Sequence, residues 1–185
     1  MKITPIAHGL DLLKSDTERS VGLHASDIYG RLYQSLEPKR YKDTEGDSLR
    51  MSMGLAWEQY LEAVMLRNGH NVSRPGSLMS RYGFEYSPDG IIVNGKERVA
   101  EYKLTWMSAS ETLDDPKFDK WHTQVKLYAA QLEIPRAEFW VNFVNGDYKK
   151  NRDPDLRVYQ VEYSKRELAE NETMLLRFAQ HEGML

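Results

Sequence analysis

The chain has 185 residues, the size of a single domain, and its 41% apolar and 11% aromatic residues can form a sizeable core. The 29% of charged residues and the net charge of −3 indicate a soluble protein. They argue mildly against broad binding of polyanions, although a local basic groove around an acidic metal site is compatible with them. The absence of cysteine excludes disulfides, thiolate zinc sites, iron–sulfur clusters and cysteine nucleophiles.

The first part of the chain is expected to be helical after an irregular start. Residues 1–20 are weakly patterned and are expected to form a weakly ordered arm, and Ser26 can cap a short helix that Pro38 stops. A longer helix opens near Ser48 and ends at Asn68-Gly69. Its apolar residues recur at helical spacing and predict a buried stripe: Leu49, Met53, Trp57, Tyr60, Leu61, Val64 and Met65.

The rest of the chain alternates strands and helices. Asp115-Pro116 opens a helix that reaches about Leu132, and Ser164 with Glu167 forms a capping box for a final helix over about 165–180. The predicted strands are Gly83–Ser87, Ile91–Val93, Arg98–Trp106, Ala137–Val144 and Leu156–Tyr163. This order predicts an α/β fold, with a central mixed β-sheet flanked by helices and a core over about 45–163.

A predicted hairpin carries charges where a buried strand is expected. Side chains alternate along a strand, so Glu101 and Lys103 share one face of it. A two-residue loop at Asn94-Gly95 pairs residues whose numbers sum to 189 and places Asp89 opposite Ala100, on the other face. An odd-sized loop gives sums of 188 or 190, and this loop or a bulge places Asp89 on the face of Glu101.

Two carboxylates facing each other across neighbouring strands repel, and a divalent cation removes the conflict. Mg²⁺ prefers oxygen ligands and is commonly held by one or two carboxylates and a substrate phosphate. Lys103 lies two residues beyond Glu101, where its ammonium can orient or deprotonate a water and offset phosphate charge. The residues therefore predict phosphodiester hydrolysis, and the alternative is a cross-strand ion pair on a half-exposed sheet.

Two residue pairs on predicted helices can likewise be interpreted either as parts of a site or as ordinary structural residues. Gly54 and Glu58 lie four apart beside the apolar stripe, and Glu58 is either a site residue or a solvated helix charge. Gln124 and Tyr128 lie four apart on the helix after the hairpin, and they either reach towards a phosphate or lie at the edge of the core. Lys120 and Lys126 flank this second pair and are candidate substrate-binding residues.

Taken in order, these motifs resemble the PD-(D/E)XK nuclease superfamily, and they are most similar to its RecB-like and lambda-exonuclease-like branch. The motifs are Gly54-x-x-x-Glu58, Pro88-Asp89, Glu101-x-Lys103 and Gln124-x-x-x-Tyr128. The resemblance covers about residues 45–145 and implies a restriction-endonuclease-like core within a single nuclease domain over 1–185. One departure is that Trp57-Glu58 stands where many RecB-like members have a histidine ligand.

The resemblance also implies roles for individual residues. Asp89 and Glu101 are expected to be metal ligands together with the backbone carbonyl of Tyr102, and Glu58 is expected to contribute directly or through water. Lys103 is expected at the nucleophilic water, with Gln124 and Tyr128 holding substrate. The histidines His24 and His122 could lie near the cleft, but each is more often a surface or packing residue.

The expected function is that of a metal-dependent deoxyribonuclease using Mg²⁺ or Mn²⁺, an exonuclease of DNA recombination, repair or phage DNA processing. The alternatives are an endonuclease of the same superfamily and a catalytically weak nucleic-acid-binding or assembly protein with this fold. The expected partner is DNA, with a homo-oligomer or a recombination or replication protein as further possibilities. Lacking a run of about 18 apolar residues or a signal-peptide pattern, the chain is expected in the cytoplasm, or the host cytoplasm if phage-encoded.

Overall fold

The computed structural model describes residues 21–41, 48–150 and 152–185, with four α-helices and seven β-strands in these ranges. The helices are α1 (Ala25–Leu36), α2 (Ser48–Arg67), α3 (Asp119–Leu132), which follows a 3₁₀ turn at Pro116–Phe118, and α4 (Lys165–His181). The strands are β1 (Val72–Ser73), β2 (Leu78–Met79), β3 (Glu85–Tyr86), β4 (Gly90–Ile92), β5 (Arg98–Thr105), β6 (Arg136–Phe143) and β7 (Asp155–Glu162).

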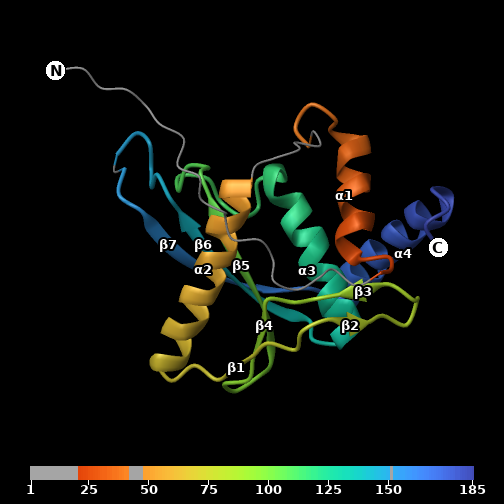
Figure 1. Ribbon diagram of the computed structural model, residues 1–185, viewed down its shortest axis with the longest axis horizontal. Coiled ribbons are helices and arrows are strands. Elements are labelled where there is room, and N and C mark those ends of the chain that lie inside the picture. Colours follow the sequence, from red (N-terminus) through yellow and green to blue (C-terminus); the bar gives the residue numbers. More distant parts are fainter. Residues whose placement is uncertain (1–20, 42–47, 151) are drawn as a thin grey trace.

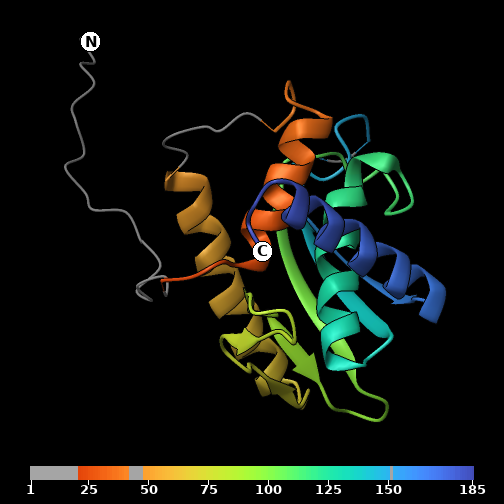
Figure 2. The same cartoon turned by 90° about the vertical axis from the view of Figure 1, so that its right-hand side faces the viewer.

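The main sheet has five strands in the order β1-β4-β5-β6-β7. The β5 and β6 strands are parallel and are connected through α3, whereas the other neighbours are antiparallel. Helix α2 covers one face of the sheet, and α3 and α4 lie on the other (Figures 1 and 2). The predicted fold class, a mixed sheet flanked by helices, is confirmed.

The two faces of the sheet carry separate apolar cores. The larger core packs α1, α3 and α4 against side chains such as Val99 and Phe139. The smaller core joins Leu61 and Met65 of α2 to the opposite face, which includes Ala100. Because neighbouring residues of β5 contribute to different cores, the alternation along this strand separates the two faces.

The hairpin of β4 and β5 has the register that brings the two acids together. Gly90 pairs with Ala100, and Ile91 pairs with Val99, so the paired residue numbers sum to 190. Of the two registers that the sequence left open, the structure has the one of an odd-sized loop, which the placement of Asp89 beside Glu101 requires. Extending this register by one residue places Asp89 opposite Glu101.

Three predicted local features are wrong. Ser26 is not the cap of α1, because the helix begins at Ala25 and the N–H of His24 donates to Asp27 Oδ2 at 3.0 Å. The predicted strand at 83–87 is not in the main sheet, because β3 pairs with β2 in a separate two-stranded sheet. Within the predicted stripe of α2, only Leu61 and Met65 are fully buried, and Leu49, Met53 and Tyr60 are exposed.

Other predicted features agree with the structure or fall outside it. Helix α4 opens with the expected capping box, in which the N–H of Glu167 donates to Ser164 Oγ at 3.2 Å and the N–H of Ser164 donates to Glu167 Oε2 at 2.8 Å. The expected N-terminal arm at 1–20 lies outside the described residues. In the described ranges, no helix combines the length and the apolar character needed to cross a membrane.

Candidate functional site

The candidate site is built around two charged residues of the central strand β5. Glu101 is fully buried, and Lys103 lies two residues on, on the same face, with its side chain 21% exposed. The Lys103 Nζ forms an ion pair with Glu101 Oε1 and donates to Gln124 Oε1 of α3 at 3.2 Å. Glu101 Oε2 is also buried, and no hydrogen-bond donor in the described part of the chain meets it.

Asp89 enters the site where β4 ends. Its Oδ2 accepts a hydrogen bond of 2.7 Å from the backbone N–H of Tyr102. This side-chain bond continues the β4–β5 pairing beyond Gly90 and Ala100, where the backbone ladder ends. The N–H and the carbonyl of one strand residue point to the same edge. The Tyr102 carbonyl therefore points to this side as well, beyond the end of β4.

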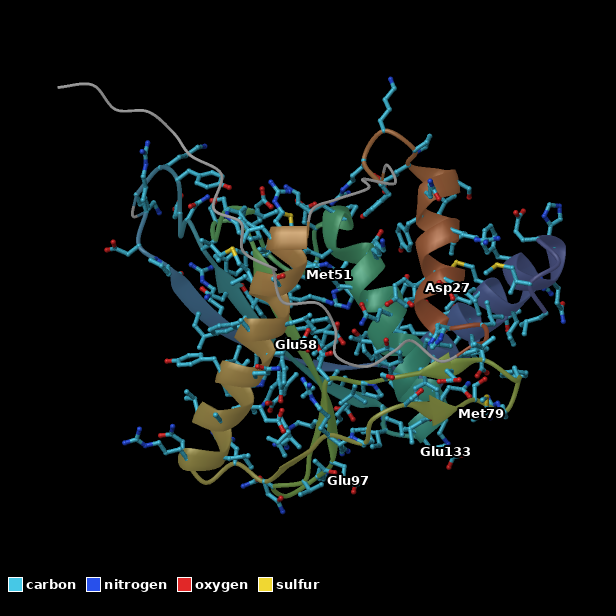
Figure 3. All side chains as sticks on the ribbon, in the orientation of Figure 1. Asp27, Met51, Glu58, Met79, Glu97 and Glu133 are labelled. Carbon is cyan, nitrogen blue, oxygen red and sulfur yellow. The ribbon has the colours of Figure 1, made fainter. Side chains whose placement is uncertain are left out.

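A third acid reaches the site from α2, on the other side of the sheet. Glu58 lies midway along this helix (Figure 3), and its side chain is 25% exposed. It is held by Arg74, whose Nη2 lies 3.2 Å from Glu58 Oε2. The Arg74 Nε also lies 3.4 Å from Glu62 Oε2 and donates to the backbone carbonyl of Asp89 at 3.2 Å.

The electrostatics of the cluster disfavour three ionised acids. Burial raises the pKa of Glu101 to about 8, and the charge of Asp89 adds to this while Lys103 opposes it. Burial and the charge of Asp89 raise the pKa of Glu58 to about 7, and burial also raises the pKa of Asp89. Burial lowers the pKa of Lys103, but the carboxylates of Glu101 and Asp89 outweigh it and hold this pKa above its usual value. The lysine therefore stays charged, whereas the three acids favour their neutral forms until a bound cation stabilises the carboxylates.

Helices α3 and α1 close the site from the side of the larger core. Gln124 Nε2 donates to the Tyr128 hydroxyl at 3.3 Å, so the predicted pair is joined to Lys103 in one chain of hydrogen bonds. The buried hydroxyl of Tyr29, from α1, is hydrogen-bonded to Tyr128, and burial raises the pKa of Tyr29 to about 12. Tyr29 is not part of any sequence motif, and its only signal in the sequence is its place on the apolar face of a short helix.

The structure separates the two predicted lysines of α3. Lys120 is half-buried and close enough to Lys103 for their charges to interact. Burial lowers the pKa of Lys120, and the charge of Lys103 lowers it further. The Lys120 Nζ lies 4.7 Å from the Tyr41 ring centroid. Lys126 instead lies 5.4 Å from the Tyr163 ring centroid, and the structure does not bring it to the acids.

Neither histidine considered from the sequence joins the acids. Both ring nitrogens of His122 are occupied in packing, since Nδ1 lies 2.7 Å from the Tyr163 hydroxyl and Nε2 lies 2.9 Å from the Leu113 carbonyl. His24 is the N-cap residue of α1.

A polar pocket of about 410 Å³ adjoins Lys120. It lies between one side of α1 and the turn after it, and its described lining includes the basic side chains of Arg31, Arg40 and Lys120. Among the described residues, the acid Asp27 also lines it. Basic side chains of this kind are the usual partners of phosphate groups. The pocket is linked to the site through Lys120, whose charge interacts with that of Lys103.

The donor set fits a hard divalent cation. Asp89, Glu101 and the Tyr102 carbonyl supply oxygen atoms, and Glu101 Oε2 is a buried carboxylate oxygen without a donor in the described ranges. Among the described residues, no three histidine, cysteine, aspartate or glutamate side chains converge closely enough to hold a metal ion together. Two carboxylates with a carbonyl remain sufficient for Mg²⁺, which usually keeps several waters.

The fold is shared with solved structures of low sequence identity. The alkaline exonuclease LHK-Exo from Laribacter hongkongensis is 17% identical with a TM-score of 0.53, and the similarity covers 86% of this chain and 87% of that chain. LHK-Exo in complex with dAMP is 18% identical with a TM-score of 0.56 and the same two coverages, 86% and 87%. A protein described as SSO0001 is 13% identical with a TM-score of 0.53, over 87% of this chain and 78% of that one. No family model and no curated protein sequence matches the chain.

Proposed function

We propose that the chain is a metal-dependent deoxyribonuclease that hydrolyses phosphodiester bonds with Mg²⁺ or Mn²⁺. The observation that carries the proposal is the convergence of Asp89, Glu101 and Lys103 at the point where β4 leaves β5 uncovered. The fold shared with an alkaline exonuclease supports it. We favour exonuclease action in DNA recombination, repair or phage DNA processing, because the Gln124 and Tyr128 pair is typical of that branch of the superfamily.

The residues of the site have distinct roles in this proposal. Asp89, Glu101 and the Tyr102 carbonyl would hold the cation, with Glu58 contributing directly or through water. When bound, the cation would supply positive charge against the phosphate and the leaving oxygen. Lys103 is held as an ammonium by its two acidic neighbours, so it would donate to the attacking water and to the phosphate rather than accept a proton.

The substrate-binding groups are proposed on α3 and beside it. Gln124 orients Lys103 through its Oε1 and would present its amide to the substrate. Tyr128 is buried and would act by positioning Gln124. Lys120 and the basic pocket beside it would contact the DNA backbone, since phosphate contacts fix a protein on its substrate.

Digestion of end-labelled linear DNA and closed circular DNA in Mg²⁺ tests the proposal. We expect the linear substrate to lose its label and the circle to persist, whereas an endonuclease would cut both. Asp89→Ala and Glu101→Ala should each abolish Mn²⁺ binding and cleavage. Lys103→Ala should bind Mn²⁺ but lose cleavage by about 10²–10⁴-fold, the range for a lost proton-transfer or orienting group.

An exposed lysine near the C-terminal end of the chain provides the matched control for Lys103→Ala. Lys165 is the first residue of α4 and is exposed, so Lys165→Ala should cleave at the wild-type rate. Cleavage by Lys103→Ala at the wild-type rate would contradict the role given to this lysine. A protein that holds DNA equally well with chelator present, and cuts neither substrate, would instead be a binding module.

A further inference from the structure

Arg74 is a second basic residue, besides Lys103, that contacts the acids of the site, and the sequence motifs do not include it. It lies between β1 and β2, and its guanidinium makes three contacts with two separate parts of the fold. The contacts are 3.2 Å to Glu58, 3.4 Å to Glu62 and 3.2 Å to the backbone carbonyl of Asp89. The first two acids belong to α2, and the third contact belongs to the turn that precedes β4.

The guanidinium is a permanent charge in a fixed position. Arginine keeps its proton in proteins, and its planar fork of donors matches carboxylate oxygens. The Arg74 side chain is 37% exposed, whereas those of Glu58 and Glu62 are 25% and 28% exposed. The arginine therefore contacts both acids and is itself partly accessible to a substrate.

Nucleases that use two metal ions hold them about 3.5–4 Å apart, with acidic residues on both sides. In this chain Asp89 and Glu101 are available for one ion, and a second ion beside Asp89 would need the acids of α2. Arg74 holds both of those acids and contacts Asp89 as well. A second ion that used the two acids of α2 would therefore have to displace the guanidinium of Arg74.

We propose that Arg74 replaces the second cation, so that the site binds one divalent ion and the guanidinium provides the other positive charge. This inference rests on the proposed function and specifies its metal stoichiometry. Because Arg74 is anchored from two elements, its charge is already oriented when a phosphate arrives. Glu58 then acts on the single ion through water only.

The test counts bound Mn²⁺ by calorimetry and by the electron paramagnetic resonance signal of free Mn²⁺, without DNA. We expect one ion for the wild type and two for Arg74→Ala, because the substitution frees the two acids of α2. Arg74→Lys keeps the charge and should bind one ion. The double variant Arg74→Ala/Glu58→Gln should return to one, since the second ion then lacks its main ligand.

The control removes an equal charge far from the site. The Arg166 side chain is 83% exposed and lies 3.7 Å from Glu170, so Arg166→Ala should bind one ion. Circular dichroism and melting check that each variant is folded, and Arg74→Gln, which is neutral and nearly as long, replaces Arg74→Ala if that variant is not.

The outcomes separate this inference from the function on which it rests. Two ions in the wild type, or one ion in a folded neutral Arg74 variant, would overturn the role of Arg74 and leave the nuclease proposal standing. No bound Mn²⁺ in the wild type would overturn both. One ion in the wild type and two in the neutral variant would support the replacement.

Discussion

Glu101 is a fully buried carboxylate in the centre of a sheet, and its surroundings make ionisation costly without a bound cation. Its folded-state pKa of about 8 lies above the ordinary value of 4.5, so the folded protein holds this proton more tightly than the unfolded chain. Stability of the metal-free protein should therefore fall as the pH rises from about 4.5 to 8. Burial of this acid is consistent with a role as a ligand rather than as a stabilising ion pair.

The variant Glu101→Gln tests whether the buried carboxylate of Glu101 destabilises the metal-free protein at high pH. In the presence of chelator, it should raise the free energy of unfolding by an amount on the order of 3 kcal/mol at pH 9, because it removes the buried charge. At pH 5 the gain should nearly vanish, since the wild-type acid is then protonated in the folded state. Urea denaturation at both pH values measures it.

An exposed acid gives the comparison for this prediction. The Glu162 side chain is 68% exposed, so Glu162→Gln should change the unfolding free energy little and equally at both pH values. A Glu101→Gln variant that is less stable than the wild type at pH 9 would show that its pairing with Lys103 outweighs its burial.

At the level of elements, the position of Asp89 depends on how closely β4 approaches its neighbours. A Cβ atom added to Gly90 would lie 2.9 Å from Val72 Cγ1 and 3.0 Å from the Tyr102 hydroxyl oxygen. Both distances are tighter than ordinary contact, so a larger residue would force the side chain of Val72 or Tyr102, or the strand that carries it, to shift. Glycine at this position therefore keeps β4 close to both neighbouring strands, directly beside the acid.

Gly90→Ala is expected to lower the free energy of unfolding by about 1–3 kcal/mol, the usual cost of overpacking a core. It should also weaken Mn²⁺ binding, because Asp89 moves with β4. Gly54→Ala is the matched control: nothing lies within 4 Å of its added Cβ, and alanine in a helix should stabilise by about 0.5–1 kcal/mol. Equal stability of Gly90→Ala and the wild type would contradict the close approach.

The sequence predicts elements best where local chemistry decides them. The capping box of Ser164 and Glu167 follows from residues close in the chain, whereas the hairpin register stayed open in the sequence and is decided by the pairing of Gly90 with Ala100. The stripe of α2 was predicted too wide, because spacing marks the apolar residues of a helix but not which of them a neighbour covers. The two-residue strands β1 and β2 are too short for any alternation to show.

The dependence on residues close in the chain also explains which candidate site residues could be predicted. Asp89 and Glu101 are close in sequence, and counting reduced their relation to two registers, one of which pairs them, while Lys103 follows from strand alternation. Arg74 and Tyr29 reach the site from segments that carry no motif, and only the packing of α2 and α1 brings them there. Sequence spacing therefore finds a site's central residues more readily than the groups that surround them.

At the scale of the whole molecule, the site lies between two cores of unequal size. The smaller core depends on α2, which covers its face of the sheet and contributes Leu61 and Met65 (Figure 2). The larger core includes residues of three helices. We therefore expect the α2 side to open at lower free energy than the other side.

Leu61→Ala should lower the free energy of unfolding by about 2–5 kcal/mol, the usual cost of a cavity at a buried leucine. Amide hydrogen exchange should rise most in α2 and β1. Leu66→Ala on the same helix is the control, since Leu66 is 51% exposed and its truncation should cost less than about 0.5 kcal/mol. Uniform acceleration of exchange across α3 and α4 would contradict two separable cores.

The parallel pairing of β5 and β6 has a consequence for biosynthesis. Glu101 leaves the ribosome before α3 and β6, and until β6 pairs with it, β5 would be an uncovered edge strand exposed to water. In a nascent chain that stops before Phe143, the acids are therefore not yet buried by the complete sheet and α3. Any hydrolytic capacity of the proposed site would thus emerge late in translation, after the crossover has been completed.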